Sequence, residues 1–360
     1  MKVLVATGAS GGHIFPAVSF IDALETKHKG TDTLLVLPKR GIGSGILLAD
    51  CKIKYISTST ITFSISTANF IAIVRFLKGT WESLMIILEF KPDIVVGFGS
   101  LDSIPCLLIA WLFRIKTLIH EQNVLPGRAN RLLAHFCDRV AVSFVKTKDY
   151  LNINQKKIVV TGNPLLRQLK KIDRNTALDS FSLSKDKFTV LVMGGSQGSR
   201  HINSGFLNAV ANLSDISMIQ VIHLAGVGEV REVKEVYKNI NLNHRVYDFL
   251  ENMGEAYSAS DIVISRAGAT TIAELISFKL PGIVSPYPYA YAHQFENAKV
   301  LGDRGCVIII NDDQLEKEVF KITLETLINN RDKLESMRSG YSGLSMDGAA
   351  NLLADAVLAL

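Results

Sequence analysis

The sequence predicts an α/β protein built from two doubly wound, Rossmann-like domains that face each other across a cleft. Short apolar strands alternate with helical stretches along the first half of the chain, and the alternation restarts in the second half. Strands that are apolar throughout indicate a parallel sheet covered by helices on both faces. A glycine-rich loop follows the first strand of each series, so both halves begin in the same way.

The expected strands fall into two series, separated by a polar, lysine-rich stretch over 163–187. The first series comprises Lys2–Thr7, Thr33–Leu37, Ile53–Ile56, Asp93–Gly97, Thr117–His120, Arg139–Ser143 and Lys157–Thr161. The second comprises Phe188–Met193, Met218–His223, Arg245–Asp248, Asp261–Ile264, Gly282–Ser285 and Val307–Ile310. We therefore expect one domain over 1–163, a second over 164–345, and a last helix over 346–360 that packs back on the first domain.

The composition is that of a folded protein. The chain has 360 residues, of which 48% are hydrophobic and 20% charged, and its net charge of +5 is too small to indicate a nucleic-acid partner. Its four cysteines are far apart, which argues for reduced thiols in a cytosolic protein and against a zinc site. The apolar run over 104–113 is too short to cross a bilayer, so we expect no membrane-spanning helix.

The segment over 265–298 points most directly to function. A strand breaks at a glycine turn and a helix begins near Thr270, so unpaired N–H groups and a positive dipole end are available to a phosphate. Glu274, one turn into this helix, can accept hydrogen bonds from both hydroxyls of a ribose. Three polar residues at helical spacing can read sugar hydroxyls: His293, Gln294 and Asn297. The segment predicts half of a nucleotide-sugar site.

The first glycine loop, Thr7-Gly-Ala-Ser-Gly-Gly-His13, lies between the first strand and the first helix. Its backbone N–H groups can cradle a diphosphate; the alternative is a plain tight turn. The loop lacks the GxGxxG spacing of a dinucleotide fingerprint. His13 stands at the helix start, where the dipole lowers its pKa and favours the neutral imidazole. It is a candidate general base for a sugar hydroxyl, or else a phosphate or packing contact.

Three further motifs follow predicted strands. In His120-Glu-Gln-Asn123, we expect Asn123 to contact the substrate and the others to organise the loop. Gly162-Asn-Pro-Leu-Leu-Arg167 suits a hinge turn, and Arg167 adds a fork of donors for a diphosphate. In Gly194-Gly-Ser-Gln-Gly198, Ser196 can donate to a phosphate oxygen. Neither an HExxH nor a DxD motif occurs, so no metal site is predicted.

A long amphipathic helix is predicted over 70–88. One apolar stripe fits core packing: Phe70, Val74, Leu77, Trp81, Leu84 and Leu88. Other apolar residues lie outside the stripe, and Arg75 and Lys78 flank it, which suits a surface that docks on anionic lipid. Core packing and membrane contact both remain open at this point.

Taken together, the motifs resemble the MurG family of bacterial UDP-N-acetylglucosamine transferases. GASGGHIFPA, HEQN, GNP, GGSQG, SRAGATTIAE and HQFENA occur in that family's order, from Gly8 to Ala298. The resemblance implies the GT-B glycosyltransferase fold, with a lipid acceptor in the first domain and UDP-GlcNAc in the second. It also implies peripheral attachment to the cytoplasmic face of the cell membrane, with an anionic lipid surface as a partner. We expect no cofactor and no metal.

By matching motif, the resemblance places these residues at the substrates: Ser10, Gly11, Gly12, Asn123, Arg167, Ser196, Leu250, Ala269, Thr270, Thr271, Ile272, Ala273, Glu274 and Gln294. Leu250 would present backbone groups to the uracil. The sequence departs from the family in two places. Ala9 stands where the family usually has glycine, and GNPLLR moves the arginine by one position, which puts the reach of Arg167 in question.

The implied reaction transfers N-acetylglucosamine to the C4 hydroxyl of undecaprenyl-diphospho-N-acetylmuramoyl-pentapeptide, with inversion. His13 would take the acceptor proton, while helix N-termini, Ser196 and Arg167 would stabilise the departing diphosphate. Three alternatives remain: a glycolipid synthase that uses diacylglycerol, a UDP-GlcNAc 2-epimerase, and a non-catalytic protein that binds UDP. The epimerase would need acidic groups around the sugar, whereas the motifs here are mostly neutral.

Overall fold

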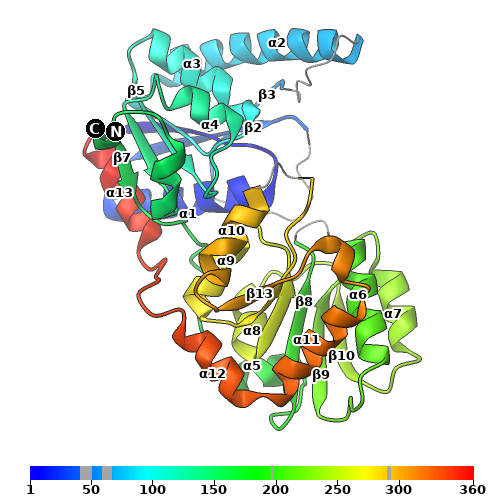
Figure 1. Ribbon diagram of the computed structural model, residues 1–360. Coiled ribbons are helices and arrows are strands. Elements are labelled where there is room, and N and C mark those ends of the chain that lie inside the picture. Colours follow the sequence, from blue (N-terminus) through cyan, green and yellow to red (C-terminus); the bar gives the residue numbers. More distant parts are fainter. Residues whose placement is uncertain (41–50, 59–66, 196–197, 290–292) are drawn as a thin grey trace. The chain divides into compact units, whose positions relative to one another are not determined.

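Two units make up the protein in the computed structural model, which describes residues 1–40, 51–58, 67–195, 198–289 and 293–360 (Figure 1). Unit 1 comprises Met1–Leu166 together with Met346–Leu360, and unit 2 comprises Arg167–Ser345. Each unit contains one sheet, and the strand pairs of both sheets are parallel. Parallel strands joined through helices bury both sheet faces, which explains why the central strands are mostly apolar. The edge strands β3 (Ile53–Ile56) and β10 (Asn243–Tyr247) carry polar residues and are only partly buried.

Within the described residues, the sheet of unit 1 has seven strands in the order β3-β2-β1-β4-β5-β6-β7. The strands are β1 (Lys2–Ala6), β2 (Asp32–Pro38), β3 (Ile53–Ile56), β4 (Ile94–Gly97), β5 (Lys116–Glu121), β6 (Arg139–Val142) and β7 (Ile158–Val160). The helices are α1 (Gly11–Lys27), α2 (Thr67–Phe90), α3 (Ile104–Leu112), α4 (Arg128–Leu133) and α13 (Ala349–Leu358), with 3₁₀ turns at Leu101–Ser103, Val145–Tyr150 and Gln155–Lys157.

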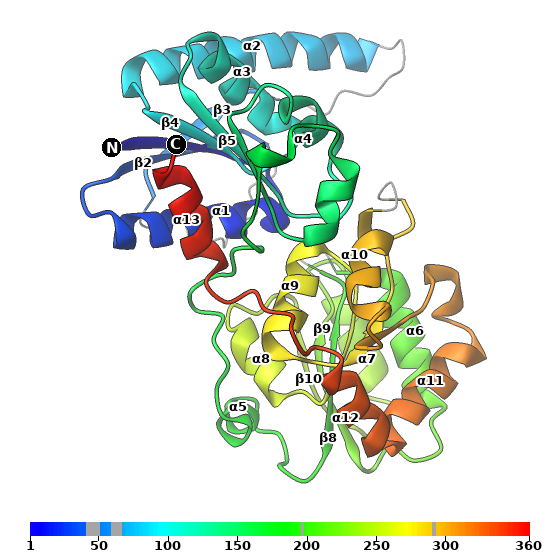
Figure 2. The same cartoon turned by 60° about the vertical axis from the view of Figure 1, so that its left-hand side comes forward.

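Helices cover both faces of this sheet. Along β1, Leu4 and Ala6 belong to the core beneath α2, α3 and α4, whereas Val3 and Val5 belong to the core formed with α1 and α13. This alternation is the two-residue period of a strand between two helical layers. Figures 1 and 2 both show α13 lying beside α1. The two helices pack together, and Arg139 donates to the carbonyl of Ala356 at 3.1 Å. The end of the chain is thus part of unit 1.

The sheet of unit 2 has six strands in the order β10-β9-β8-β11-β12-β13 within the described residues. The strands are β8 (Phe188–Met193), β9 (Ile219–Leu224), β10 (Asn243–Tyr247), β11 (Ile262–Ser265), β12 (Gly282–Val284) and β13 (Val307–Ile309). The helices are α5 (Arg174–Ser180), α6 (Arg200–Ala211), α7 (Val230–Tyr237), α8 (Met253–Ala259), α9 (Ala269–Phe278), α10 (His293–Gly302), α11 (Glu318–Asn329) and α12 (Arg331–Ser339), with a 3₁₀ turn at Asp312–Gln314.

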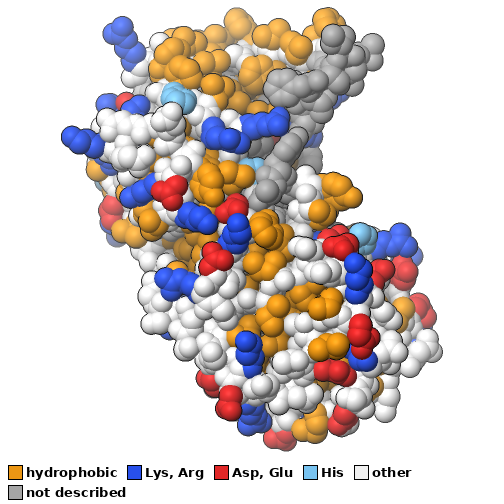
Figure 3. All heavy atoms as spheres, viewed as in Figure 1, with side chains coloured by type: hydrophobic (Ala, Val, Ile, Leu, Met, Phe, Trp, Pro, Cys, Tyr) orange, Lys and Arg blue, Asp and Glu red, His pale blue; other side chains and the backbone are white. Residues whose placement is uncertain are grey.

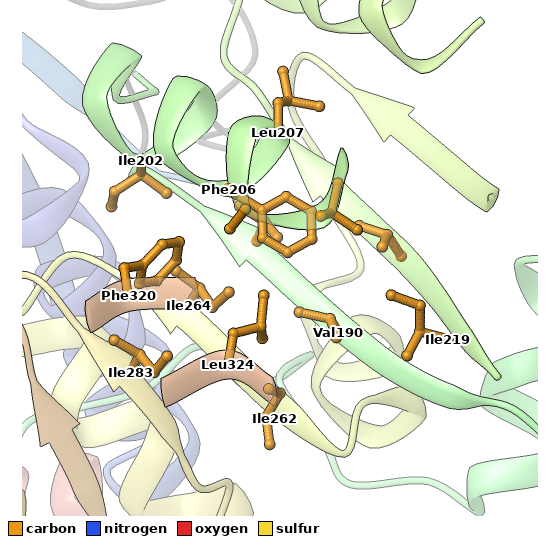
Figure 4. Close-up of a cluster of buried hydrophobic side chains, with 14 of the residues drawn as sticks. Val190, Ile202, Phe206, Leu207, Ile219, Ile262, Ile264, Ile283, Phe320 and Leu324 are labelled. Atoms are coloured by element: carbon orange, nitrogen blue, oxygen red, sulfur yellow. The ribbon is translucent and has the colours of Figure 1, made fainter. Parts of the chain in front are cut away.

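One core of unit 2 lies between the sheet and the helices α6 and α11. Figure 4 shows Phe206 of α6 and Leu324 of α11 in one cluster with Val190 of β8 and Ile264 of β11. These side chains are fully buried. Each expected strand is present near its predicted position. The largest shift is in β10, which was expected to begin at Arg245 and begins at Asn243. The predicted fold class is confirmed.

Helix α2 corrects one prediction: most of its apolar stripe does not pack in the core. Phe70, Leu77 and Trp81 are 70%, 63% and 62% exposed. The buried face of α2 instead carries the small residues Ala72, Gly79 and Ser83, and Ile86 and Ile87 near the end of the helix join the core. A Cβ atom on Gly79 would lie 2.1 Å from the carbonyl oxygen of Ser57. Five of the six stripe residues are exposed and only Leu84 packs against the core, so the core-packing interpretation was wrong for most of the stripe.

Candidate functional site

The strand order of each sheet reverses at one place, between β1 and β4 in unit 1 and between β8 and β11 in unit 2. In doubly wound sheets, ligands bind outside the carboxyl ends of the strands at such a switch point. Helix α1 begins at this edge of unit 1, and helices α6 and α9 begin at this edge of unit 2. Each unit therefore has one candidate half-site.

The N-terminus of α1 is open. Ser10 is the N-cap residue with extended backbone (φ −89°, ψ 150°), its hydroxyl makes no capping hydrogen bond, and its side chain is exposed. The first N–H groups of a helix are the donors that an anion uses. Gly8 lets this loop approach the chain after β4, because a Cβ there would lie 2.6 Å from that of Ser100. Contacts of Ser10, Gly11 and Gly12 with a diphosphate stay predictions.

His13 lies in the first turn of α1 and is partly buried. Its Nδ1 is 3.2 Å from Oε1 of Gln122. The ring is flanked by two glycines, since Cβ atoms built on Gly8 and Gly99 would come within 3.2 and 3.4 Å of ring carbons. Burial lowers the pKa of His13, and the nearby charge of Glu121 and the hydrogen bond that His13 makes to Gln122 oppose this only in part. The imidazole is therefore neutral near pH 7, as a general base must be.

The motif after β5 is organised by Glu121, which is almost fully buried. Its carboxylate accepts from the backbone N–H of Asn123 (2.8 Å), the backbone N–H of Gly127 (3.0 Å) and the side-chain amide of Asn130 (2.8 Å). These partners lie in the loop after β5 and in helix α4 that follows it, so Glu121 holds this segment in shape. Asn123 also donates its side-chain amide to Glu121 at 3.2 Å. A substrate contact by Asn123 stays a prediction.

Arg167 is exposed at the start of unit 2. The preceding Gly162 adopts a positive φ of +80°, which glycine tolerates, and lies close to Met346 and Ala349. A contact of Arg167 with a diphosphate stays a prediction.

In unit 2, α9 begins at Ala269 with Gly268 as the N-cap residue and no side-chain cap. The Oγ1 of Thr270, at this helix start, is buried and has no hydrogen-bond partner within the described residues. The same holds for the Oγ of Ser265 at the end of β11. Buried hydroxyls are normally hydrogen-bonded, so two without partners beside an uncapped helix suit a bound ligand or water.

Glu274 lies one turn into α9, as expected, and accepts a 2.7 Å hydrogen bond from the hydroxyl of Tyr257. Burial raises the pKa of Glu274 to about 7, and the bond from Tyr257 opposes that rise. Tyr257 fixes one carboxylate oxygen and leaves hydrogen-bonding capacity for a diol. Tyr257 was not predicted, because nothing in the sequence pairs residues from α8 and α9.

Arg266 is the centre of a network that the sequence did not reveal. Its guanidinium pairs with Asp312, donates to the hydroxyl of Ser199 at 2.8 Å, and donates to the carbonyl of Ser285 at 3.3 Å. Ser199 is the N-cap of α6, and its Oγ accepts from the N–H of Ile202 at 3.5 Å. Arg266 therefore ties the start of α6 to the loop before α9. The predicted phosphate ligand Ser196 lies outside the described residues.

The predicted sugar-reading residues of α10 hold the loops around α9. Gln294 accepts through Oε1 from the backbone N–H groups of Ala267 (3.3 Å) and Tyr287 (2.9 Å). Asn297 is fully buried and donates to the carbonyl of Ala267 at 3.2 Å. Both side chains thus support the entry to α9. Their direct contact with a sugar stays a prediction.

The other predicted residues of unit 2 lie at or near the same edge. Leu250 is partly buried and follows β10. Ile272 and Ala273 are fully buried, so only their backbone could face a ligand, while Ala269 and Thr271 lie in the first turn of α9. Among the described residues, no group of three or more His, Cys, Asp or Glu side chains is arranged to hold a metal ion. Likewise, none of the described helices combines the length and apolar character that a bilayer crossing requires.

Two consecutive doubly wound units, each with an uncapped helix start at its switch point, are the architecture of the GT-B class. Family models agree: the glycosyltransferase family 28 N-terminal domain matches residues 3–142, and the C-terminal domain matches residues 189–353. The chain is 36% identical over 345 residues to the UDP-N-acetylglucosamine–N-acetylmuramyl-(pentapeptide) pyrophosphoryl-undecaprenol N-acetylglucosamine transferase of Desulforamulus reducens. That alignment covers 94% of this chain and 92% of the relative.

Solved structures give the same result. The crystal structure of Acinetobacter baumannii MurG is 26% identical, with a TM-score of 0.79 over 100% of this chain and 99% of that one. The chain belongs to glycosyltransferase family 28 and, within it, to the MurG family, and it is an enzyme. A UDP-GlcNAc 2-epimerase from Neisseria meningitidis is also similar, with a TM-score of 0.67 over the full length of both chains. Its 15% identity shows a shared fold only.

Proposed function

We propose that this glycosyltransferase moves N-acetylglucosamine from UDP-GlcNAc to the C4 hydroxyl of undecaprenyl-diphospho-N-acetylmuramoyl-pentapeptide, converting lipid I to lipid II in peptidoglycan synthesis. The reaction in the name of the Desulforamulus reducens relative, which aligns with nearly the whole chain, carries this proposal. A neutral histidine at one switch point and a nucleotide-type helix start at the other support it.

The chemistry is a single displacement. The acceptor oxygen forms a bond to C1 of the sugar, and the bond from C1 to the β-phosphate oxygen breaks, so the configuration inverts. The hydroxyl proton passes to Nε2 of His13, and the electrons of the broken bond leave with UDP. A correctly placed base of this kind contributes about 10²- to 10⁴-fold to a rate. The half-buried, neutral state of His13 supports this role.

Unit 2 holds the donor. Glu274 accepts hydrogen bonds from the ribose hydroxyls, the backbone at Leu250 faces the uracil, and the first turn of α9 receives the diphosphate. The partnerless hydroxyl of Thr270 and the free accepting capacity of Glu274 support this placement. Ser196 and Arg167 add donors to the leaving group, and the network around Arg266 holds two helix starts in place for it.

The enzyme attaches to the cytoplasmic face of the membrane through the apolar face of unit 1. Its exposed side chains come from three neighbouring elements: Phe70, Leu77 and Trp81 of α2, Trp111 and Leu112 of α3, and Leu132 of α4. Figure 3 shows hydrophobic side chains gathered over α2 and α3. Exposed basic residues lie on or beside these helices, including Arg75, Lys78 and Arg114. An apolar face with basic neighbours suits anionic lipid headgroups.

The deciding experiment is a transfer assay with purified protein, radiolabelled UDP-GlcNAc and a lipid I analogue, with and without EDTA. We expect label in the lipid product in both arms, because helix N-termini and hydrogen-bond donors take the place of a metal bridge. Parallel reactions use diacylglycerol as the acceptor or UDP-galactose as the donor. Label in diacylglycerol, or epimerised sugar without transfer to lipid, would contradict the proposal.

A further inference from the structure

A chain of hydrogen bonds connects His13 to the end of β7 through two buried side chains. Gln122 is 1% exposed and His120 is fully buried, and both lie at the carboxyl end of β5. His13 Nδ1 lies 3.2 Å from Gln122 Oε1, Gln122 Nε2 lies 3.1 Å from His120 Nδ1, and His120 Nε2 lies 3.0 Å from the carbonyl oxygen of Gly162. All of these residues belong to unit 1.

Backbone carbonyls determine which group donates in each of these hydrogen bonds, because a carbonyl oxygen can only accept. Gln122 Nε2 lies 3.2 Å from the carbonyl oxygen of Phe98, so the amide nitrogen must face that oxygen. The amide oxygen then faces His13. Since an amide oxygen also only accepts, Nδ1 of His13 must carry the proton. The lone pair of the neutral imidazole is consequently on Nε2.

The far end of the chain requires the same direction. Gly162 accepts from Nε2 of His120, so the neutral ring of His120 presents an unprotonated Nδ1 to Gln122. Burial lowers the pKa of His120 to about 4, so this ring stays neutral and keeps its accepting nitrogen at physiological pH. The amide nitrogen of Gln122 faces acceptors only, namely Nδ1 of His120 and the carbonyl oxygens of Phe98 and His120 (3.2 and 3.3 Å). Each hydrogen bond then joins a donor to an acceptor, and reversing any one of them would place two acceptors against each other.

We infer that Gln122 and His120 are positioning residues that hold His13 as its Nδ1–H tautomer, with Nε2 presented as the base for the acceptor hydroxyl. This inference rests on the proposed function, in which His13 takes the acceptor proton. The buried anchors sit on β5 and β7, and the orientation of His13 therefore depends on the sheet and not on α1 alone.

The chain orients the base but does not conduct its proton, because an amide cannot pass a proton along. When Nε2 takes the hydroxyl proton, the imidazolium keeps its bond from Nδ1 to Gln122. The charge of Glu121, which acts on His13 through space, favours that cation. The proton therefore stays on His13 until solvent removes it after the sugar has moved.

The test combines ¹⁵N NMR of the histidine rings with steady-state kinetics on the full-length enzyme. The ¹⁵N shifts of wild-type His13 should report the Nδ1–H tautomer. Gln122→Met removes the acceptor, and His120→Phe removes the next link, so both should give His13 a mixture of tautomers. Both should lower kcat by roughly 10- to 100-fold, by analogy with other orienting partners, and leave the KM for UDP-GlcNAc nearly unchanged.

Gln122→Glu is the matched variant, because its carboxylate can still accept from Nδ1 although it cannot donate to Phe98. It should retain the Nδ1–H tautomer that Gln122→Met loses, which a purely structural role would not predict. An Nε2–H tautomer in the wild type would overturn the inference without any variant. If His13→Ala abolishes turnover while Gln122→Met keeps both turnover and tautomer, only the orienting role fails. If His13→Ala is fully active, the proposed base itself fails.

Discussion

The two switch-point edges of this enzyme hold charge in opposite ways. The edge of unit 1 places neutral groups, an amide and a second imidazole, next to His13. The two carboxylates that act on His13 from nearby are held by other partners, Glu121 by its own loop and Asp102 by Arg40 and Thr58. The edge of unit 2 is built on a buried ion pair between Arg266 and Asp312 and on a carboxylate at Glu274. A base has to stay neutral to accept a proton, whereas a nucleotide needs fixed donors and acceptors. Each edge therefore suits one half of the reaction.

The largest expected effect tests the neutral edge. His13→Ala should lower kcat by about 10²- to 10⁴-fold, because it removes the base, and should leave UDP-GlcNAc affinity unchanged, because the donor is held by unit 2. Transfer assays and calorimetry measure the two quantities separately. His28→Ala is the control, since His28 caps the other end of α1 and bonds only locally to Thr31. Loss of UDP-GlcNAc affinity in His13→Ala would contradict the assignment of the donor site to unit 2.

The next effect tests the charged edge. Arg266→Met should destabilise unit 2 by about 3–5 kcal/mol, because it leaves Asp312 buried without its partner, and should weaken UDP-GlcNAc binding. Arg174→Met is the matched control: its pair with Asp261 is more exposed, so the expected cost is about 1 kcal/mol or less. Denaturant unfolding followed by calorimetry compares the two. Equal losses in the free energy of unfolding would mean that the Arg266–Asp312 pair contributes no more than an exposed ion pair.

A substitution at Glu274 should have opposite effects on folding stability and on donor binding. Its pKa is raised from 4.5 to about 7 in the folded protein. Between these two pH values the folded state therefore keeps a proton on Glu274 that the unfolded state has lost. The contribution of Glu274 to the free energy of unfolding is fully present below pH 4.5 and is lost as the pH rises through about 7. Glu274→Gln should therefore be more stable than the wild type at pH 8, by on the order of 1–3 kcal/mol, and similar to it near pH 4.5.

The same variant should bind UDP-GlcNAc roughly 10- to 100-fold more weakly, because a neutral amide is a poorer acceptor for ribose hydroxyls than a carboxylate. Wild-type affinity should rise with pH through about 7 as Glu274 ionises, and this dependence should vanish in Glu274→Gln. Isothermal titration at several pH values measures both effects. Glu335→Gln serves as the control, since Glu335 is exposed and pairs only with Arg338. An unchanged affinity in Glu274→Gln would remove Glu274 from the donor site.

The smallest effect lies away from both edges. Trp81→Glu on the exposed face of α2 should weaken binding to anionic vesicles by about 2 kcal/mol per buried aromatic side chain and leave donor affinity intact. Ile322→Glu on α11 of unit 2 is an apolar control that is also more than half exposed and should not change vesicle binding. Vesicle co-sedimentation compares the two variants. Equal losses would mean that the apolar face of unit 1 has no special affinity for lipid.

Some parts of the site could be predicted because the signal is local in sequence. The helix start after a glycine turn, with Glu274 one turn later, follows from the spacing of adjacent residues, and so does His13 at the start of α1. The partners of these residues could not be predicted. Tyr257 and Gln122 come from other elements of the chain, and the pairings exist only because the sheets bring strand ends together.

Helix α2 shows the same limit for packing. The sequence indicated an amphipathic helix and a choice between two roles for its apolar stripe. Periodicity cannot decide which face is buried when small residues on the opposite side allow a closer approach to the sheet, as Gly79 does at Ser57. The outward position of Trp81 became visible only from the packed structure.

The sequence by itself determined the two doubly wound units, their glycine loops and the family, because hydrophobic period and motif order are properties of neighbouring residues. The tertiary structure alone decided which groups share a proton, which charge is buried, and which apolar face meets solvent. These depend on distances between segments far apart in the chain, and such distances are set by packing and not by spacing along the sequence.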